Sequence, residues 1–189
     1  MGIRKNTIKI KTALISLSDK SNLRPLLNLL KKYKIKIISS GGTYKKIKSM
    51  GFKCLEVSKF TNSKELLDGR VKTLHPKIHA GILAKSHDDL KGCSGAYDLI
   101  DIVIVNLYPF EQTITKSHCT YKDAIEDIDI GGPTMLRAAA KNHDRVTVIT
   151  DPNDYNLVIE EIIKNKKTSL KLRKHLAYKV FSHTSGYDA

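Results

Sequence analysis

The stretch Ile100–Leu107, IDIVIVNL, gives the strongest strand signal in this 189-residue chain. Its continuous run of isoleucine and valine is typical of a strand that is buried on both faces of a parallel sheet. Shorter apolar segments predict four further strands, at Ala13–Leu17, Ile35–Ser39, Phe52–Val57 and Arg145–Thr150. We therefore expect the chain to be built around one central sheet.

Helical stretches separate these segments, with apolar residues at three- and four-residue spacing; they are Asn22–Lys32, Tyr44–Met50, Thr120–Asp127 and Pro133–Asn142. Such alternation predicts an α/β fold with three αβα layers and a mainly parallel central sheet. Two more helices are expected after the last strand, at Asp154–Lys164 and Leu170–Phe181. We expect a single domain, with a core at about 12–150 and a C-terminal helical extension at about 151–189.

The region from Ser58 to Gly81 is polar and punctuated by glycine, and only its segment SKELL (63–67) looks helical. His75 and His79 have the i, i+4 spacing of a helical zinc pair. Pro76 follows His75 directly, which argues against a helix carrying both, and no acidic cluster completes a site. The three cysteines are widely spaced and include no C-x-x-C pair. We expect no metal and no disulfide framework, with the histidines packing a loop onto the sheet.

The chain is strongly basic, with 33 Lys and Arg against 19 Asp and Glu, a net charge of +14. A basic domain invites a nucleic-acid interpretation. However, lysine far outnumbers arginine and is spread over helices and loops, and aromatic residues do not alternate with it as a stacking platform requires. We interpret the charge as a solvated surface compatible with small anionic ligands. No apolar run reaches the roughly 18 residues of a spanning helix, so we expect no membrane partner and a cytoplasmic location.

In parallel sheets, ligands bind in the loops that follow the carboxyl ends of the strands. Ser18 and Lys20 follow the first predicted strand, and S-S-G-G-T (39–43) follows the second. Adjacent glycines let main-chain N–H groups approach an anion at a helix N-terminus. Two interpretations stay open: a phosphate cradle completed by Lys20, or an ordinary strand–helix turn with Thr43 as the N-cap.

Two further strand-end segments carry polar residues. Asn106 and Tyr108 close the IDIVIVNL strand, where they could bind a heterocycle or carboxamide, or simply cap the strand. Asp129 precedes a Gly-Gly-Pro that opens a helix, and the N–H groups of residues 130–132 suit a developing oxyanion. Lys141 lies near the C-terminal end of that helix. The alternative is a capped helix with a solvated lysine.

Six motifs occur in the order in which one family carries them: S-L-S-D-K, S-S-G-G-T, D-G-R-V-K-T-L-H-P-K-I-H-A-G-I-L, V-N-L-Y-P-F, I-D-I-G-G-P-T-M-L-R-A-A-A-K-N-H and F-S-H-T-S-G-Y-D-A. They resemble the N-terminal IMP cyclohydrolase domain of the bifunctional AICAR transformylase/IMP cyclohydrolase family, which has a methylglyoxal-synthase-like fold. The resemblance runs from about Thr12 to the end of the chain. The R-V-K-T-L-H-P and I-D-I-G-G motifs are specific, whereas S-G-G-T is shared more widely among methylglyoxal-synthase-like domains.

The resemblance implies an enzyme of purine biosynthesis that closes 5-formamidoimidazole-4-carboxamide ribonucleotide to inosine monophosphate with loss of water. It implies no cofactor, a homodimer, and a transformylase domain that is absent from this chain. The implied catalytic residues are Lys72, Tyr108, Asp129 and Lys141. Asp129 with Lys141, and Tyr108 with Lys72, would move the protons. The implied nucleotide-binding residues are Ser18, Lys20, Ser40, Gly41, Gly42, Thr43, Arg70, Thr73, Asn106, Ile130, Gly131 and Gly132.

Two other functions account for part of the sequence. A methylglyoxal-synthase-like lyase acting on a triose phosphate would share the phosphate loop, but it has no use for R-V-K-T-L-H-P or for the Asp129–Lys141 spacing. A nucleotide-sensing regulatory module would need none of the candidate catalytic residue types, all of which are present. Ring closure of the ribonucleotide is the favoured hypothesis.

Overall fold

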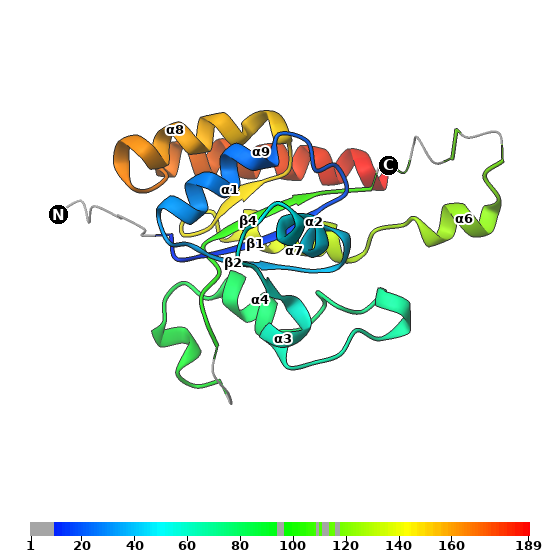
Figure 1. The fold of residues 1–189 in the computed structure, drawn as a ribbon. Helices are drawn as coiled ribbons and strands as arrows, with labels where there is room; N and C mark the ends of the chain where they lie inside the picture. The colour runs from blue at the N-terminus through cyan, green and yellow to red at the C-terminus, as the bar shows by residue number, and fades with distance from the viewer. Residues whose placement is uncertain (1–9, 94–96, 109, 111–113, 116–117) are drawn as a thin grey trace.

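The computed structural model describes residues 10–93, 97–108, 110, 114–115 and 118–189. Within them, five strands form one sheet in the order β3-β2-β1-β4-β5, and every pairing is parallel (Figure 1). The strands are β1 (Thr12–Leu17), β2 (Lys36–Ser39), β3 (Leu55–Glu56), β4 (Ile102–Asn106) and β5 (Thr147–Ile149). The α/β prediction with a parallel sheet is confirmed.

The IDIVIVNL segment forms β4, which lies between β1 and β5. The side chains of residues 102–105 are at most 1% exposed, as expected of a strand covered on both faces. In the register of β1 with β4, Ala13 pairs with Ile102 and Leu17 pairs with Asn106. The two strands therefore end at the same level, and the loops that follow them meet.

Helices cover both faces of the sheet. Helix α1 (Leu23–Lys32) contacts α8 (Tyr155–Asn165) on one face, and α4 (Pro76–Leu83) contacts α7 (Gly131–Lys141) on the other (Figure 1). The long C-terminal helix α9 (Leu170–Asp188) packs against α7 and β5. The remaining helices are α2 (Gly41–Ser49), α3 (Val57–Thr61) and α6 (Tyr121–Glu126), with 3-10 turns at Leu67–Gly69, Asp88–Leu90 and Pro152–Asp154.

The predictions for the region after β2 needed correction. The strand expected at Phe52–Val57 is only the two residues of β3, because Val57 already begins α3. The helix expected at SKELL is absent: Ser63–Glu65 has no regular structure. Leu67 and Gly69 have positive φ angles of 52° and 91°, which an α-helix does not allow. Leu66 is 57% exposed, so the segment has no buried apolar face to support a helix.

The histidine-containing loop was also predicted incorrectly in part, because α4 begins at Pro76. Proline is tolerated at the first helical position, where the N–H that it lacks has no intrahelical acceptor. His75 is the N-cap of α4, and its Nδ1 accepts the Lys77 N–H at 3.1 Å. The two histidines thus differ in setting: His75 caps the helix, whereas His79 lies within it.

Neither a membrane-spanning helix nor a metal-binding cluster is found among the residues that the structure describes. No helix in the part of the chain that the structure describes is both long and apolar enough to cross a bilayer. No group of three or more His, Cys, Asp or Glu side chains among those residues is arranged to hold a metal ion.

Candidate functional site

The carboxyl edge of the sheet brings together most of the residues that the sequence singled out. Strands β2 and β4 lie on either side of β1, so the direction in which the chain adds strands changes at β1. Ligands of parallel α/β sheets bind at such a switch point. Ser18 and Lys20 follow β1, Ser40 to Thr43 follow β2 at the start of α2, and Asn106 is the last residue of β4.

Asn106 organises the loop after β1. Its Oδ1 accepts the N–H groups of Ser18 at 2.7 Å and Asp19 at 3.0 Å. Its Nδ2 donates to the Asp19 carbonyl at 2.8 Å. The amide side chain, expected to contact the nucleotide, therefore holds the Ser18–Asp19 main chain in place.

Thr43 has a comparable structural contact at the start of α2. Its side chain is buried, its hydroxyl donates to the Leu17 carbonyl at 3.0 Å, and its Oγ1 accepts the Leu17 N–H at 2.9 Å. The N-cap of α2 is Ser40, so the alternative interpretation with Thr43 as the N-cap is wrong. Thr43 instead fastens the first turn of α2 to the end of β1.

The N-terminus of α2 presents main-chain donors to the same edge. The first backbone bond back to Ser40 comes from the Tyr44 N–H, so the N–H groups of Gly41, Gly42 and Thr43 have no intrahelical acceptor. Gly41 has a φ of +53°, a conformation that suits glycine. This turn has the geometry of an anion site.

Two lysines lie beside this turn. A Cβ placed on Gly42 would lie 4.0 Å from Lys20 Cε, and a Cβ placed on Gly41 would lie 3.7 Å from Lys72 Nζ. The Lys20 ammonium donates to the Ser18 carbonyl at 2.9 Å. The absence of side chains at Gly41 and Gly42 thus leaves main-chain N–H groups and two cations facing one space.

Asp129 lies at the N-terminus of α7. Its Oδ1 accepts the Gly132 N–H at 2.8 Å. Burial raises the pKa of the Asp129 carboxyl above its ordinary value, while the Gly132 N–H, the Lys72 ammonium and the Gly131 N–H oppose that rise. The Gly132 N–H is one of the donors that the sequence suggested for an oxyanion. In the structure it is already hydrogen-bonded to Asp129.

The glycines after Asp129 allow this close packing. A Cβ on Gly132 would lie 2.3 Å from Asp129 Oδ2 and 2.7 Å from Leu107 Cδ2. A Cβ on Gly131 would lie 2.6 Å from Thr73 Oγ1. Thr73, which is buried, and Asp129 therefore approach the same helix N-terminus, and Lys72 lies between this helix and α2.

Arg70 and Tyr108 border this region. The Arg70 guanidinium forms two hydrogen bonds to the Glu126 carboxylate of α6, one of them from Nε to Oε1 at 3.1 Å. Tyr108 follows β4 and is 53% exposed. Ile130 is 58% exposed beside Asp129. Arg70 thus links the R-V-K-T segment to α6, and the two exposed apolar residues are open to a ligand.

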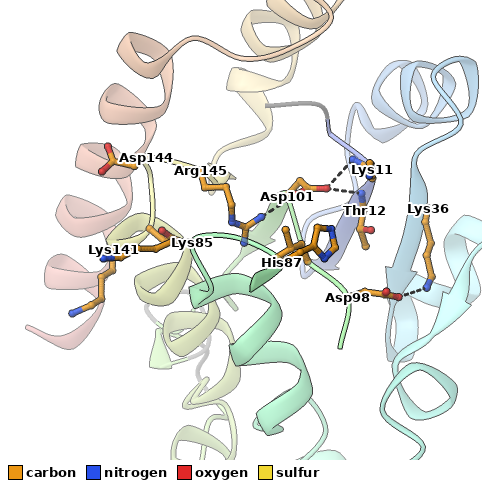
Figure 2. A pocket seen from close by; sticks show the side chains of 12 residues that line it. Lys11, Thr12, Lys36, Lys85, His87, Asp98, Asp101, Lys141, Asp144 and Arg145 are labelled. Atoms are coloured by element: carbon orange, nitrogen blue, oxygen red, sulfur yellow. Dashed lines mark hydrogen bonds and ion pairs between the residues drawn. The ribbon is translucent and has the colours of Figure 1, made fainter. Parts of the chain in front are cut away.

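Lys141 does not join the other candidates in this chain. It is the last residue of α7, whereas Gly131 is the first, and ten helical steps separate them by roughly 15 Å. Lys141 lines a cavity of about 880 Å³ with Thr12 and Lys36, which begin their strands, at the amino edge of the sheet. In Figure 2 its side chain points away from the Arg145–Asp101 pair.

The polar groups at the back of that cavity bond to one another. Asp101 accepts the Lys11 N–H at 2.8 Å, the Thr12 N–H at 3.1 Å and the Arg145 guanidinium at 3.0 Å (Figure 2). Lys36 pairs with Asp98 at 3.1 Å. The buried charges of this cavity are thus neutralised within the fold.

Sequence reasoning assigned no role to Tyr187, which the structure places at the site. Its hydroxyl accepts the Asp129 N–H at 2.9 Å, across 58 positions of the chain. The F-S-H-T-S-G-Y-D-A motif contained the residue, but no local pattern relates a residue near the C-terminus to a loop so distant in sequence.

Comparisons with known proteins show which families and proteins the chain is similar to. The MGS-like domain family matches residues 22–134, and the AICARFT/IMPCHase bienzyme family matches residues 139–189. The chain is 53% identical over 184 residues to the bifunctional purine biosynthesis protein PurH of Acetivibrio thermocellus, and 49% identical over 183 residues to that of Bacillus subtilis. These alignments cover 95% of the chain but 35% and 36% of the relatives, so the chain spans about a third of their length.

A solved structure titled "Crystal structure of ForH" superposes with a TM-score of 0.81 and 30% sequence identity, covering 95% of both chains. The chain thus shares its fold with an experimental structure over 95% of its length. The chain belongs to the MGS-like domain family.

Proposed function

We propose that this chain is an IMP cyclohydrolase that converts 5-formamidoimidazole-4-carboxamide ribonucleotide to inosine monophosphate in purine biosynthesis. Its similarity to bifunctional purine biosynthesis proteins, and to the AICARFT/IMPCHase family over residues 139–189, supports this activity. The observation that carries it is the placement of Lys72 between an anion-binding helix turn and the half-buried Asp129.

The 5′-phosphate would bind at the N-terminus of α2. Main-chain N–H groups of Gly41, Gly42 and Thr43 point there, and Lys20 adds positive charge. Ser40, the N-cap of α2, flanks the same space, whereas Thr73 lies beside the N-terminus of α7. Asn106 and Ser18 would act by holding the loop after β1, and Arg70 by its link to Glu126 of α6.

The chemistry needs a proton acceptor and a proton donor close together. The carboxamide nitrogen attacks the formyl carbon and loses one proton, the formamido nitrogen loses a second, and the former carbonyl oxygen gains two protons and leaves as water. The proposed mechanism gives Asp129 and Lys72 the proton transfers, since Lys72 already influences the Asp129 carboxyl electrostatically. Tyr108 and the main chain at Ile130 face the reacting groups. Lys141, at the other end of α7, has no direct step within this chain.

Purified chain mixed with the formamido ribonucleotide should form inosine monophosphate, followed by ultraviolet absorbance. Lys72→Ala should lower kcat by about a hundredfold or more, because proton transfer contributes that much, with KM little changed. Absence of ring closure by folded protein contradicts the proposal. A triose phosphate serves as the second substrate: release of methylglyoxal would favour the lyase instead.

We further propose that the chain acts in the cytoplasm as a homodimer. Helix α6 stands away from the body of the molecule (Figure 1), and none of its residues is buried. Tyr121 is 84% exposed and Ile125 is 46% exposed. We favour a second copy of the chain as the partner that packs on these exposed side chains, because Glu126 links α6 to the site through Arg70. Sedimentation should show a dimer that Tyr121→Asp weakens; a wild-type monomer at assay concentrations contradicts it.

A further inference from the structure

The C-terminal end of α9 contacts the loop that carries Asp129. The Tyr187 hydroxyl accepts the Asp129 N–H at 2.9 Å and donates to the Asp127 carbonyl at 3.4 Å. Phe110, which follows the end of β4, meets the Tyr187 ring edge-on at 6.4 Å between centroids. One side chain therefore lies against two strand-end segments of the candidate site.

The two hydrogen bonds require a group that both donates and accepts. A tyrosine hydroxyl meets this need and a phenylalanine does not. Burial raises the pKa of the Tyr187 hydroxyl, which keeps it protonated and able to donate. With the hydroxyl removed, the Asp129 N–H and the Asp127 carbonyl each lose the hydrogen bond that Tyr187 makes to them.

Asp129 is thereby held from two directions. Its main-chain N–H is bound by Tyr187, and its carboxylate accepts the Gly132 N–H at 2.8 Å. These contacts fix both ends of the residue and thus the direction in which the carboxylate points. Displacement of a reacting group by about 1 Å is enough to lower a rate a hundredfold.

Tyr187 is not needed to hold α9 in place. The fully buried Arg173 donates to the carbonyls of His143, Thr168 and Asp144 at 2.6–2.9 Å. Leu176 and Val180 are at most 1% exposed along the same helix. The helix is therefore fastened about two to four turns before Tyr187, and the tyrosine acts on the Asp129 loop.

We propose that Tyr187 is a positioning residue for Asp129, through which the C-terminal end of α9 sets the alignment of the catalytic carboxylate. The kinetic part rests on the proposed ring closure; the effect on the Asp129 loop does not. The F-S-H-T-S-G-Y-D-A motif thus gains a role in the site.

Tyr187→Phe tests this role, with Tyr178→Phe as its control. Tyr178 lies on the same helix and is 72% exposed, so it undergoes the same chemical change away from the site. Tyr187→Phe should lower kcat about tenfold to a hundredfold, with KM within about twofold. Hydrogen exchange of the Asp129 amide should be faster in Tyr187→Phe and unchanged in Tyr178→Phe.

Equal kcat and equal Asp129 exchange in the two variants overturn the proposal. Loss of amide protection along the whole of α9 in Tyr187→Phe overturns it too, because the tyrosine would then only tether the helix. If the wild-type chain closes no ring, the proposed function fails, while the exchange experiment still decides whether Tyr187 holds Asp129.

Discussion

Asp129 combines a burial cost with three stabilising neighbours. Burial favours its neutral form, and the Gly132 N–H, the Lys72 ammonium and the Gly131 N–H favour the carboxylate. The net result is a pKa above the ordinary aspartate value of 3.8. A carboxyl with a raised pKa accepts a proton more readily, which suits a group that exchanges protons with a substrate.

The titration of Asp129 gives a prediction that does not depend on turnover. Lys72→Ala removes a cation that lowers the Asp129 pKa, so the pKa should rise further. Carbon NMR of the carboxyl across a pH series measures this directly. In wild-type kinetics, activity should fall as pH falls through the raised pKa, because the carboxylate form is lost. Lys64→Ala, which removes a lysine on the SKELL segment, serves as the charge-matched control. An Asp129 pKa that is the same in Lys72→Ala as in the wild type contradicts the electrostatic interaction between Lys72 and Asp129.

At the scale of elements, two helix N-termini meet at the carboxyl edge of the sheet. Helix α2 begins at Gly41 and α7 begins at Gly131, and in both cases a side chain at the glycine would project at a site residue. Lys72 lies beside the first and Thr73 beside the second. Adjacent residues of the R-V-K-T segment therefore lie beside the N-termini of two different helices.

Gly132→Ala should damage the site through packing alone. The added Cβ would lie 2.3 Å from Asp129 Oδ2 and 2.7 Å from Leu107 Cδ2, so the carboxylate must move. We expect kcat to fall about tenfold to a hundredfold because of this displacement. Gly92→Ala is the control, since a Cβ there meets nothing within 4 Å. Equal ring-closure rates for both variants would show that the Asp129 position is not critical.

At the scale of the whole molecule, the two edges of the sheet have different roles. The carboxyl edge leaves main-chain donors and lysines facing open space, whereas the amino edge holds the buried Arg145–Asp101 ion pair. Arg145 donates there to Asp101 and to the carbonyls of Gly81, Ile82 and Ala84 at 2.7–3.0 Å. It thereby joins the end of α4 to the starts of β1 and β4 through Asp101.

Arg145→Ala should lower the free energy of unfolding by about 3–5 kcal/mol, because it leaves a buried carboxylate without its counter-ion. Both side chains of the pair are less than a tenth exposed. Urea unfolding followed by circular dichroism measures the change. Arg24→Ala, at an exposed position of α1, should alter stability by no more than about 0.5 kcal/mol. A loss for Arg145→Ala as small as that of Arg24→Ala contradicts the role of the pair.

The regular part of the fold followed from local pattern. IDIVIVNL predicted β4 because a strand covered on both faces needs a continuous apolar run. The spacing of leucines predicted α1 because a helix with one face toward the core repeats its apolar residues every three or four positions. The pattern failed at SKELL and at Pro76–Leu83. In the first, positive φ angles and exposure replace the helix, and in the second a proline starts the helix that it was expected to prevent.

The layered α/β architecture and the motifs at the strand ends could be predicted from local sequence, since both depend on periods and turns a few residues long. Which of those residues meet depends on the packing of the folded chain. That packing separated Lys141 from Asp129 by the length of α7, committed the side chains of Asn106 and Thr43 to the main chain of β1 and its following loop, and brought Tyr187 to Asp129. Contacts across 26 to 88 positions depend on how helices and strands pack, and no local period in the sequence records them.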